Sequence, residues 1–287
     1  MSQPASQAAA IEAELVYTVD DGTKPVTSTA GIHEVLDDRR GEREPRRVAI
    51  HDGRPGIGGY SLDVEGFVCV RHETAVKDFY DPEQIRKVYY PEMEALIRRE
   101  TGAARVLVFD HTLRAADPEL RDAKQVRDAV RAVHNDYTEW SGPQRVRDLL
   151  PAAEAEALLQ HRFMVVQVWR PTAAPVEATP LAIADARSIA PSDLIPSERR
   201  YPDRVGEIYQ LKYSPAHRWF WFPAMRRDEA LVFKCYDSMT DGRARWTAHT
   251  GFDHPAPRPG APPRESIEIR SFAFFAPGKV VGRYRRL

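Results

Sequence analysis

The sequence has few cysteines and no long apolar run. Its two cysteines, Cys69 and Cys235, form no C-x-x-C pair, which excludes a disulfide framework and a cysteine-based zinc site. We therefore expect two reduced, buried thiols. No apolar stretch approaches the roughly 18 residues that span a bilayer. The segment Met1–Ala10 also lacks the basic start and apolar core of a secretory signal, so the expected location is the cytoplasm.

An excess of charge is also absent, because 41 basic and 42 acidic residues leave a formal net charge of -1. Neither nucleic acid nor a membrane surface is therefore an expected partner. The chain contains no G-x-S-x-G hydrolase elbow, and the glycines at 56–59 are not followed by the lysine of a phosphate-binding loop. These absences leave a small molecule as the expected partner. They do not decide the oligomeric state, for which a homodimer is one option.

The sequence predicts a few helices and a longer series of short strands. Asp81 followed by a proline predicts the start of a helix that ends near Gly102 and is kinked by Pro91. A second helix is predicted over 146–160, with a break at Pro151. Further short strands are predicted at 12–18, 47–51, 66–72, 105–110, 130–135, 163–170, 181–184, 207–213, 218–222, 230–236, 246–249 and 266–275. Such a series indicates a sandwich or barrel.

The domain organisation follows from this order of elements. We expect residues 1–129 to form an N-terminal elaboration of strands and helices. This part packs on a β-rich catalytic core over residues 130–287, and the two parts make one compact domain.

The segment His134-Asn135-Asp136 stands at the end of a predicted strand. Residues two apart in a strand point to the same face, so the imidazole and the carboxylate can reach one metal ion. With a second histidine they would form the triad of non-haem iron(II) oxygenases, which leaves three coordination positions open. The pair alone is weak evidence, because a chain with nine histidines often contains one by chance.

Two later histidines compete for the third ligand position. His249 lies in a segment predicted as a strand, whereas His254 lies in a loop before Pro255. A strand holds a ligand more rigidly than a loop does, so His249 is the preferred ligand.

Arg264 and Arg270 are six residues apart in a strand-like stretch, which places them on one face with Ser266 and Glu268. The alternate residues between Ser266 and Arg270 are isoleucines. A polar inward face is suited to a barrel that holds a cofactor, and a guanidinium group can bind a carboxylate with two hydrogen bonds. Glu268 is expected to form an ion pair that fixes one of these arginines.

Longer segments carry a family resemblance. They are HNDYT, SGPQRV, RPTAAPVEATPLAIADARSI, GEIYQLKYSPAHRWFWFPAMRRDEALVFKCYDS, HTGFDHP and PPRESIEIR, in this order between about Glu65 and Phe275. On these segments the chain resembles the CmcJ/NvfI family of AsaB-like oxygenases. The resemblance implies a mainly β protein with flanking helices (α+β) around a double-stranded β-helix core, also called a jelly roll or cupin-like fold.

The implied activity is hydroxylation, desaturation or a related oxidation of an unactivated C–H bond in a natural-product-type metabolite. Iron(II), 2-oxoglutarate and O2 would be required, with succinate and CO2 as co-products.

The resemblance also implies roles for single residues. His134, Asp136 and His249 would be the iron ligands, and no catalytic residue is expected beyond this metal centre. The R-x5-R spacing is similar to that of oxygenases of the AlkB type. This similarity implies that Arg264 is the main anchor for the distal carboxylate of 2-oxoglutarate. Arg270 would help to hold the inner end of the keto acid or the metal ligands, and the ranking of the two arginines stays open.

Five further residues are candidates for the substrate pocket, namely Tyr209, Lys212, Trp219, His111 and Gln144. Each has a structural alternative. The aromatic side chains would equally suit ordinary packing, Gln144 would equally suit the start of a helix, and a single histidine is more often structural. Tyr209 and Lys212 are an odd number of residues apart, so a regular strand cannot direct both inward.

Two other functions remain open on the sequence. A zinc hydrolase could use the same triad with a bound water, although the paired arginines would then have no role. A non-catalytic jelly roll could bind a small metabolite without iron, and its ligand binding would survive the substitution His134→Ala.

Overall fold

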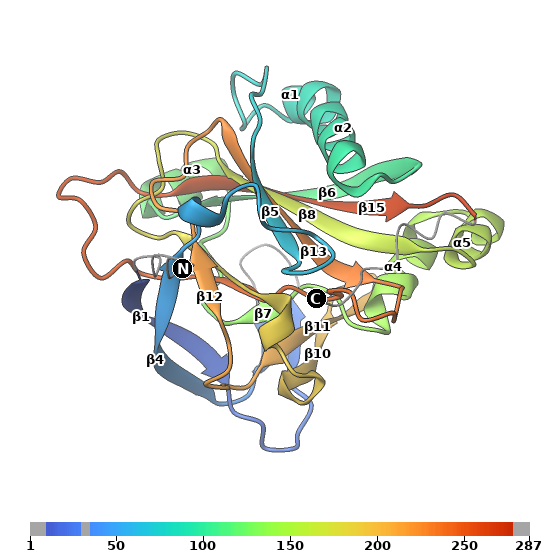
Figure 1. Cartoon of the computed structure of the whole chain (residues 1–287), viewed down its shortest axis with the longest axis horizontal. Coiled ribbons are helices and arrows are strands. Elements are labelled where there is room, and N and C mark those ends of the chain that lie inside the picture. Colours follow the sequence, from blue (N-terminus) through green and yellow to red (C-terminus); the bar gives the residue numbers. More distant parts are fainter. Residues whose placement is uncertain (1–9, 30–34, 278–287) are drawn as a thin grey trace, which may run out of the picture.

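The computed structural model describes residues 10–29 and 35–277, which form two β-sheets with short helices around them (Figure 1). The larger sheet has the order β1-β4-β12-β9-β14-β7-β11-β10-β2-β3. Its strands are β1 (Ala10–Thr18), β4 (Arg43–Asp52), β12 (Trp219–Trp221), β9 (Leu181–Ala184), β14 (His249–Gly251), β7 (His134–Asn135), β11 (Val205–Leu211), β10 (Leu194–Arg200), β2 (Val26–Thr29) and β3 (Val35–Arg39).

The smaller sheet has the order β5-β13-β8-β15-β6. Its strands are β5 (Phe67–Arg71), β13 (Glu229–Asp237), β8 (Phe163–Pro171), β15 (Glu265–Phe274) and β6 (Arg105–Ala115). Strand β15 alternates as the sequence predicts, because Ile267 and Ile269 pack under the helix side. Glu268 and Arg270 lie on the opposite face, toward the larger sheet. This alternation directs the polar residues of β15 into the space between the sheets.

One helical segment covers the outer face of the smaller sheet. It consists of α1 (Pro82–Gln84), a π-helical turn (Ile85–Tyr89) and α2 (Tyr90–Thr101), seen above β6 and β15 in Figure 1. Met93, Leu96 and Ile97 of α2 are buried against β-sheet residues. Burial of this apolar stripe fixes the helix on the sheet.

The ends of this helix agree with the sequence, whereas its middle differs. The Asp81 side chain accepts hydrogen bonds from the backbone at the helix start, and Gly102 ends the helix with φ 70°. In place of a simple kink at Pro91, the Tyr90 N–H donates to the Ile85 carbonyl five residues earlier. A proline has no N–H to donate, so the turn before it can widen into a π-helix.

The remaining helices are short and lie at the ends of strands. They are α3 (Pro118–Lys124), α4 (Ser141–Leu149) and α5 (Ala152–Leu159), with 3-10 turns at Arg54–Gly56, Ala186–Ser188 and Pro191–Asp193. The helix predicted over 146–160 is therefore two helices, and Pro151 separates them. Proline at this place ends hydrogen bonding of the first helix and begins the second.

The larger sheet curls back on itself. Strand β1 pairs with β4, and Val16 also bridges to Ala132 just before β7. One buried cluster, which includes Ile183 and Phe233, fills the space between the sheets. A second cluster, which includes Trp219, lies on the other face of the larger sheet beneath β1. Strands β7 and β14 are neighbours in the middle of the larger sheet.

Strands β1 to β6 precede residue 130 and contribute to both sheets. The part of the chain predicted as an elaboration, residues 1–129, thus supplies strands of the same two sheets as residues 130–287. We keep the assignment of one compact domain as a proposal, because sharing of sheets across residue 130 favours it.

Three predictions about strands are corrected. The segment predicted as a strand over 246–249 forms its strand later, from His249 to Gly251, and the strand predicted over 130–135 is only His134–Asn135. Strands β2, β3 and β10 are not among the strands predicted from the sequence. Their sequences are polar, so pairing with neighbouring strands rather than hydrophobic alternation defines them.

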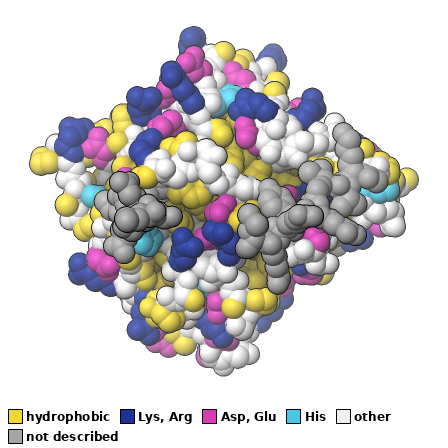
Figure 2. Space-filling model, viewed as in Figure 1, with side chains coloured by type: hydrophobic (Ala, Val, Ile, Leu, Met, Phe, Trp, Pro, Cys, Tyr) yellow, Lys and Arg dark blue, Asp and Glu magenta, His cyan; other side chains and the backbone are white. Residues whose placement is uncertain are grey.

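None of the helices in the described ranges is long and apolar enough to cross a membrane. Figure 2 shows basic and acidic side chains interspersed on the visible face, in agreement with the balanced composition. Cys69 and Cys235 are both free and buried, as predicted.

Candidate metal centre

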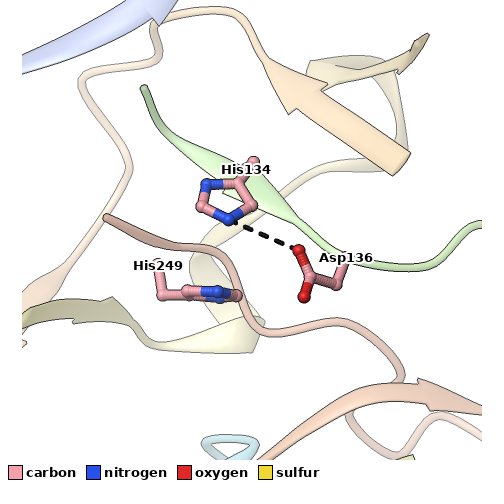
Figure 3. A group of neighbouring side chains, drawn as sticks. All are labelled: His134, Asp136 and His249. Atoms are coloured by element: carbon pink, nitrogen blue, oxygen red, sulfur yellow. Dashed lines mark ion pairs between the residues drawn. The ribbon is translucent and has the colours of Figure 1, made fainter. Parts of the chain in front are cut away.

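The structure brings His134, Asp136 and His249 together between the two sheets. His249 of β14 stands directly opposite His134 of β7, and their rings are 4.4 Å apart. One ligand atom from each of the three residues lies within 4.8 Å of the others. Figure 3 shows the two imidazoles and the carboxylate pointing to one place, with His134 Nε2 3.4 Å from Asp136 Oδ1.

Backbone carbonyls orient both imidazoles. His134 Nδ1 lies 2.7 Å from the Ala132 oxygen, and His249 Nδ1 lies 3.2 Å from the Thr247 oxygen. A carbonyl only accepts hydrogen bonds, so each Nδ1 carries the proton and each Nε2 keeps a free lone pair. Burial, together with His249, lowers the pKa of His134 to about 3, which keeps this imidazole neutral. Neutral imidazole is the form that binds a metal ion.

Two hydrogen bonds hold the Asp136 carboxylate by Oδ2, the oxygen that does not face His134. Oδ2 accepts hydrogen bonds from Gln167 Nε2 at 2.7 Å and from Arg270 Nε at 3.0 Å. Burial alone would raise the pKa of Asp136, but the Arg270 guanidinium and the two imidazoles outweigh burial and lower it far below its usual range. The carboxylate is therefore ionised, and Oδ1 is directed toward His134 Nε2.

The donor set fits a metal ion. His249 Nε2 is buried and has no hydrogen-bond partner in the described chain. A buried acceptor without a partner is costly, and a metal ion would remove that cost. Two histidines and one carboxylate on one side of an ion match the iron(II) arrangement that leaves other positions open. His254 is outside this group, because its ring packs on Trp221 at 4.9 Å.

Asn135 stands between His134 and Asp136. Its side chain ties β7 to the segment that carries His249. Its side chain donates to the Cys235 oxygen at 2.9 Å and accepts from the Thr247 N–H at 3.1 Å. The Thr247 oxygen in turn holds His249. Gly66 packs against this link, since a Cβ there would come within 2.2 Å of Thr247 Oγ1. Asn135 thus fixes the distance between β7 and the segment that carries His249.

Gln167 provides the first test of this geometry. We expect Gln167→Leu to lower metal affinity about 10- to 100-fold, the usual loss when an outer-shell partner of a ligand is removed. The cause is that Asp136 loses one of the two groups that hold Oδ2. Isothermal titration of the protein with iron(II) under nitrogen measures the affinity. An unchanged affinity with an unchanged melting temperature would contradict the role given to Gln167.

The structure separates the roles of the two arginines. Arg270 is saturated by protein groups, because its guanidinium bonds to Asp136, Thr112 and Glu268. It braces the Asp136 carboxylate, and each of its nitrogens donates to a protein group. The Glu268 contact agrees with the sequence-based expectation that this acid fixes an arginine.

Arg264 is buried and meets no carboxylate within ion-pair distance in residues 10–29 and 35–277. Its Nε donates to Ser266 Oγ at 3.0 Å and its Nη1 to the Thr179 oxygen at 3.2 Å, while its guanidinium stacks 5.1 Å from the Trp169 ring. Burial and the neighbouring Arg114 lower the pKa of Arg264 to about 9, so it is charged at neutral pH. A buried cation of this kind calls for an anion.

The structure places three other pocket candidates in or next to β11 and α4. Tyr209 pairs with Asn135 in the sheet, but its hydroxyl accepts from the Glu139 N–H at 3.3 Å and braces the loop after the ligands. Lys212 follows the end of β11 and is partly exposed. Gln144 lies in α4 and donates to Asp148 one turn later, the structural alternative for this residue.

Two candidate pocket residues are placed elsewhere by the fold. Trp219 is fully buried on the other face of the larger sheet, where its Nε1 donates to the Tyr17 hydroxyl at 2.8 Å. His111 faces the helix side of the smaller sheet and bonds to the Tyr90 hydroxyl at 2.7 Å. In both cases strand alternation sends the side chain away from the metal ligands, so we withdraw both from the pocket.

Sequence reasoning missed Gln167 and the role of Asn135. Gln167 stands alone among apolar residues in the strand FMVVQVWR, and an isolated polar residue in a fully buried strand is a signal that could have been followed. The pattern His134-Asn135-Asp136 points to the two outer side chains and gives no sign of the contacts that Asn135 makes.

Comparison with known proteins agrees with this geometry. A family model described as an oxidoreductase/YMDC permease-like domain matches residues 15–274. The Fe(II)/2-oxoglutarate-dependent dioxygenase nvfI of Aspergillus novofumigatus is 35% identical over 80% of this chain and 84% of its own length. The chain belongs to the NvfI/AsaB-like oxygenase family. The hydroxylase/desaturase CTB9 of Cercospora beticola, 33% identical over 82% of this chain and 78% of its own length, is similar to it as well.

Solved structures support the same family. The iron and alpha-ketoglutarate-dependent endoperoxidase NvfI superposes with a TM-score of 0.82 and 30% identity over 94% of this chain and 99% of its own. The mainly β, jelly-roll fold predicted for a member of the NvfI/AsaB-like family is thereby confirmed.

Proposed function

We propose that this protein is an iron(II)- and 2-oxoglutarate-dependent oxygenase that oxidises a C–H bond of a small natural-product-type metabolite. The observation that carries the proposal is a buried group of two histidines and one aspartate, in which His249 Nε2 has no hydrogen-bond partner among the residues that the structure describes. Membership of the NvfI/AsaB-like family supports the same function.

Each residue of the site has a defined task in this proposal. His134, Asp136 and His249 hold iron(II), while Gln167 and Arg270 keep the aspartate ionised and oriented. Arg264 binds the distal carboxylate of 2-oxoglutarate, which supplies the anion that this buried cation lacks. When bound, iron(II) and 2-oxoglutarate supply the activation of O2, with oxidation of the keto acid to succinate and CO2.

The apolar residues between the sheets keep water from the ligands. Phe233 packs against the His249 ring at 4.8 Å, and Ile183 pairs with His249 in the sheet. A site without bulk water strengthens the contacts to charged groups and protects reactive species from side reactions. We infer that the choice among hydroxylation, desaturation and related oxidations depends on which C–H bond the substrate presents.

The test is turnover of the keto acid. We expect purified protein with iron(II), 2-oxoglutarate and O2 to form succinate with matching O2 uptake, and a panel of small natural products to accelerate it. His134→Ala should abolish both signals, whereas Trp219→Phe, a change outside the site, should preserve them. Absence of succinate from the native protein under every condition would contradict the proposal.

A zinc hydrolase remains the alternative with the same ligands. Arg264 disfavours it, because a buried arginine that meets no carboxylate has no part in zinc-water hydrolysis. Zinc-loaded protein should therefore show no hydrolysis of ester or amide panels.

A further inference from the structure

A small apolar cavity lies within the buried cluster between the two sheets. The centre of a water-sized molecule can occupy about 10 Å³ of it. Its lining includes the buried residues Trp169, Val176, Leu181, Phe222, Met225 and Leu231. The volume is close to the smallest that holds one such molecule, so the cavity has room for a single small guest.

Two strands connect the lining of the cavity to the metal ligands. In the larger sheet, Leu181 of β9 stands two residues before Ile183, which pairs with His249. In the smaller sheet, Leu231 of β13 stands two residues before Phe233, whose ring lies 4.8 Å from the His249 ring. Residues two apart in a strand are separated by roughly 7 Å and point to the same face. The walls of the cavity are therefore one strand repeat from the residues that flank His249 in both sheets.

The lining suits an apolar guest better than water. A buried water makes hydrogen bonds to about two to four polar groups. Among the side chains that line the cavity, only the Trp169 indole offers an N–H or O–H group, and that N–H has no hydrogen-bond partner in the described residues. One donor is too few to hold a water in place. An apolar cavity of this kind stays dry and accepts small apolar molecules.

The proposed reaction consumes one small apolar molecule, which is O2. Its transfer from water into apolar surroundings is favourable for the same reason that apolar side chains are buried. 2-Oxoglutarate carries two carboxylates and is far larger than this cavity, so it does not fit the volume or the lining. Among the reactants, O2 alone matches both.

Two loops separate the cavity from solvent. Val176 lies in the loop after β8 and Met225 in the loop after β12, and the Val176 N–H donates to the Met225 oxygen at 3.0 Å. Both side chains are buried, whereas their neighbours Pro175, Ala224 and Arg226 are exposed. A single layer of side chains thus stands between the cavity and the surface on this side.

We propose that this cavity binds O2 and supplies it to the metal centre along the apolar side chains of Leu181, Ile183, Leu231 and Phe233. The role in supply rests on the proposed function, whereas binding of O2 in the cavity does not require the metal. O2 enters past Val176 and Met225 and reaches the ligands through the apolar cluster between the sheets.

The first experiment detects O2 in the metal-free, full-length protein. O2 is paramagnetic, so a bound molecule speeds the relaxation of nearby methyl groups. NMR of protein with labelled methyl groups is compared under O2 and under nitrogen. We expect the O2-dependent relaxation of the Leu181, Leu231 and Met225 methyl groups to exceed that of Ile267 several-fold. Ile267 is equally buried but lies in the cluster on the helix side of the smaller sheet.

Three variants change the size of the cavity or serve as its control. Val176→Ile adds a methylene to the lining and should remove the O2-dependent relaxation of Leu181 and Leu231. Val176→Ala enlarges the cavity and should increase that relaxation, because space left by a removed side chain is only partly refilled. Val168→Ile makes the same addition on β8, toward the helix side, and should behave as the native protein does.

The second experiment measures supply of O2 with iron(II)-loaded protein, as succinate formation at several O2 concentrations. We expect Val176→Ile to lower kcat/KM for O2 roughly 3- to 10-fold, the loss expected when a molecule the size of one or two methylenes is no longer buried. Its kcat at saturating O2 and its affinity for 2-oxoglutarate should stay unchanged, because the metal ligands and Arg264 are untouched. Val168→Ile should keep the native kcat/KM.

Three outcomes would overturn the inference. Relaxation at Leu181, Leu231 and Met225 equal to that at Ile267 would show that the cavity binds no O2, and an ordered water found in it would show that its guest is polar. A native kcat/KM for O2 in Val176→Ile, together with lost relaxation, would show that the cavity is not on the route to the metal. Failure of the proposed function is distinct, since the native protein would then form no succinate while the metal-free protein still showed the O2-dependent relaxation.

Discussion

Replacement of His249 by alanine should lower iron(II) affinity by more than about 100-fold, beyond the loss expected for an outer-shell residue. His249 supplies a buried nitrogen that has no hydrogen-bond partner in the described part of the chain, and it stands directly opposite His134 in the sheet. Removal leaves only His134 and Asp136, which stand two residues apart in one extended segment. Competition with a chromophoric chelator under nitrogen measures the affinity.

His254 gives the matched control for this change. It lies five residues later, is partly exposed, and packs its ring on Trp221. His254→Ala should therefore leave iron(II) affinity within twofold of the native value, a change below about 0.4 kcal/mol. If His254→Ala lost the metal and His249→Ala kept it, the ligand assignment would be wrong.

Arg270→Met should destabilise the protein by about 3–5 kcal/mol, since it leaves two buried carboxylates, Asp136 and Glu268, without their cation. The expected fall in Tm is roughly 10 °C for a chain of this size. Iron(II) affinity should fall as well, because Asp136 loses a hydrogen bond to Oδ2 and its pKa rises toward that of a buried acid. Differential scanning calorimetry and metal titration measure the two effects.

Arg258→Met is the control for stability, because Arg258 forms an exposed ion pair with Glu177. Exposed pairs contribute about 0–1 kcal/mol, so Tm should shift by only a few degrees. A native-like Tm for Arg270→Met would mean that the buried carboxylates are compensated by groups other than Arg270.

The closeness of His134 and Asp136 could be predicted from sequence because strand alternation is a local rule. It placed His134 and Asp136 on one face, and it placed Arg264 and Arg270 on one face of β15. The same rule does not determine which face of a neighbouring strand points toward the space between the two sheets. Trp219 and His111 were therefore assigned to a pocket from which the fold directs them away.

Arg264 and Arg270 differ in their hydrogen-bond partners, and strands that are distant in the sequence supply those partners. Arg270 is saturated because β6 and β7 bring Thr112 and Asp136 to it, from far along the chain. Within the described residues, the hydrogen bonds of Arg264 go to Ser266 and a backbone carbonyl. Pairing of strands that are remote in sequence decides such contacts, so spacing alone left the ranking of the two arginines open.

The polar strands of the fold were harder to predict than its apolar strands. Strands rich in apolar residues, such as 163–170 and 181–184, agree closely with β8 and β9. Strand β10, Leu194–Arg200, contains proline and charged residues and was not predicted. It forms because β11 and β2 pair with it on both sides, which a local pattern does not reveal.

The most direct test of the metal centre is anaerobic addition of iron(II) and 2-oxoglutarate, with visible absorption as the readout. We expect a charge-transfer band in the native protein, and loss of that band in His134→Ala, Asp136→Ala and His249→Ala. The Trp219→Phe variant should keep the band. If the native protein gave no band, or if a triad variant gave the full band, the assignment of His134, Asp136 and His249 as the iron site would be contradicted.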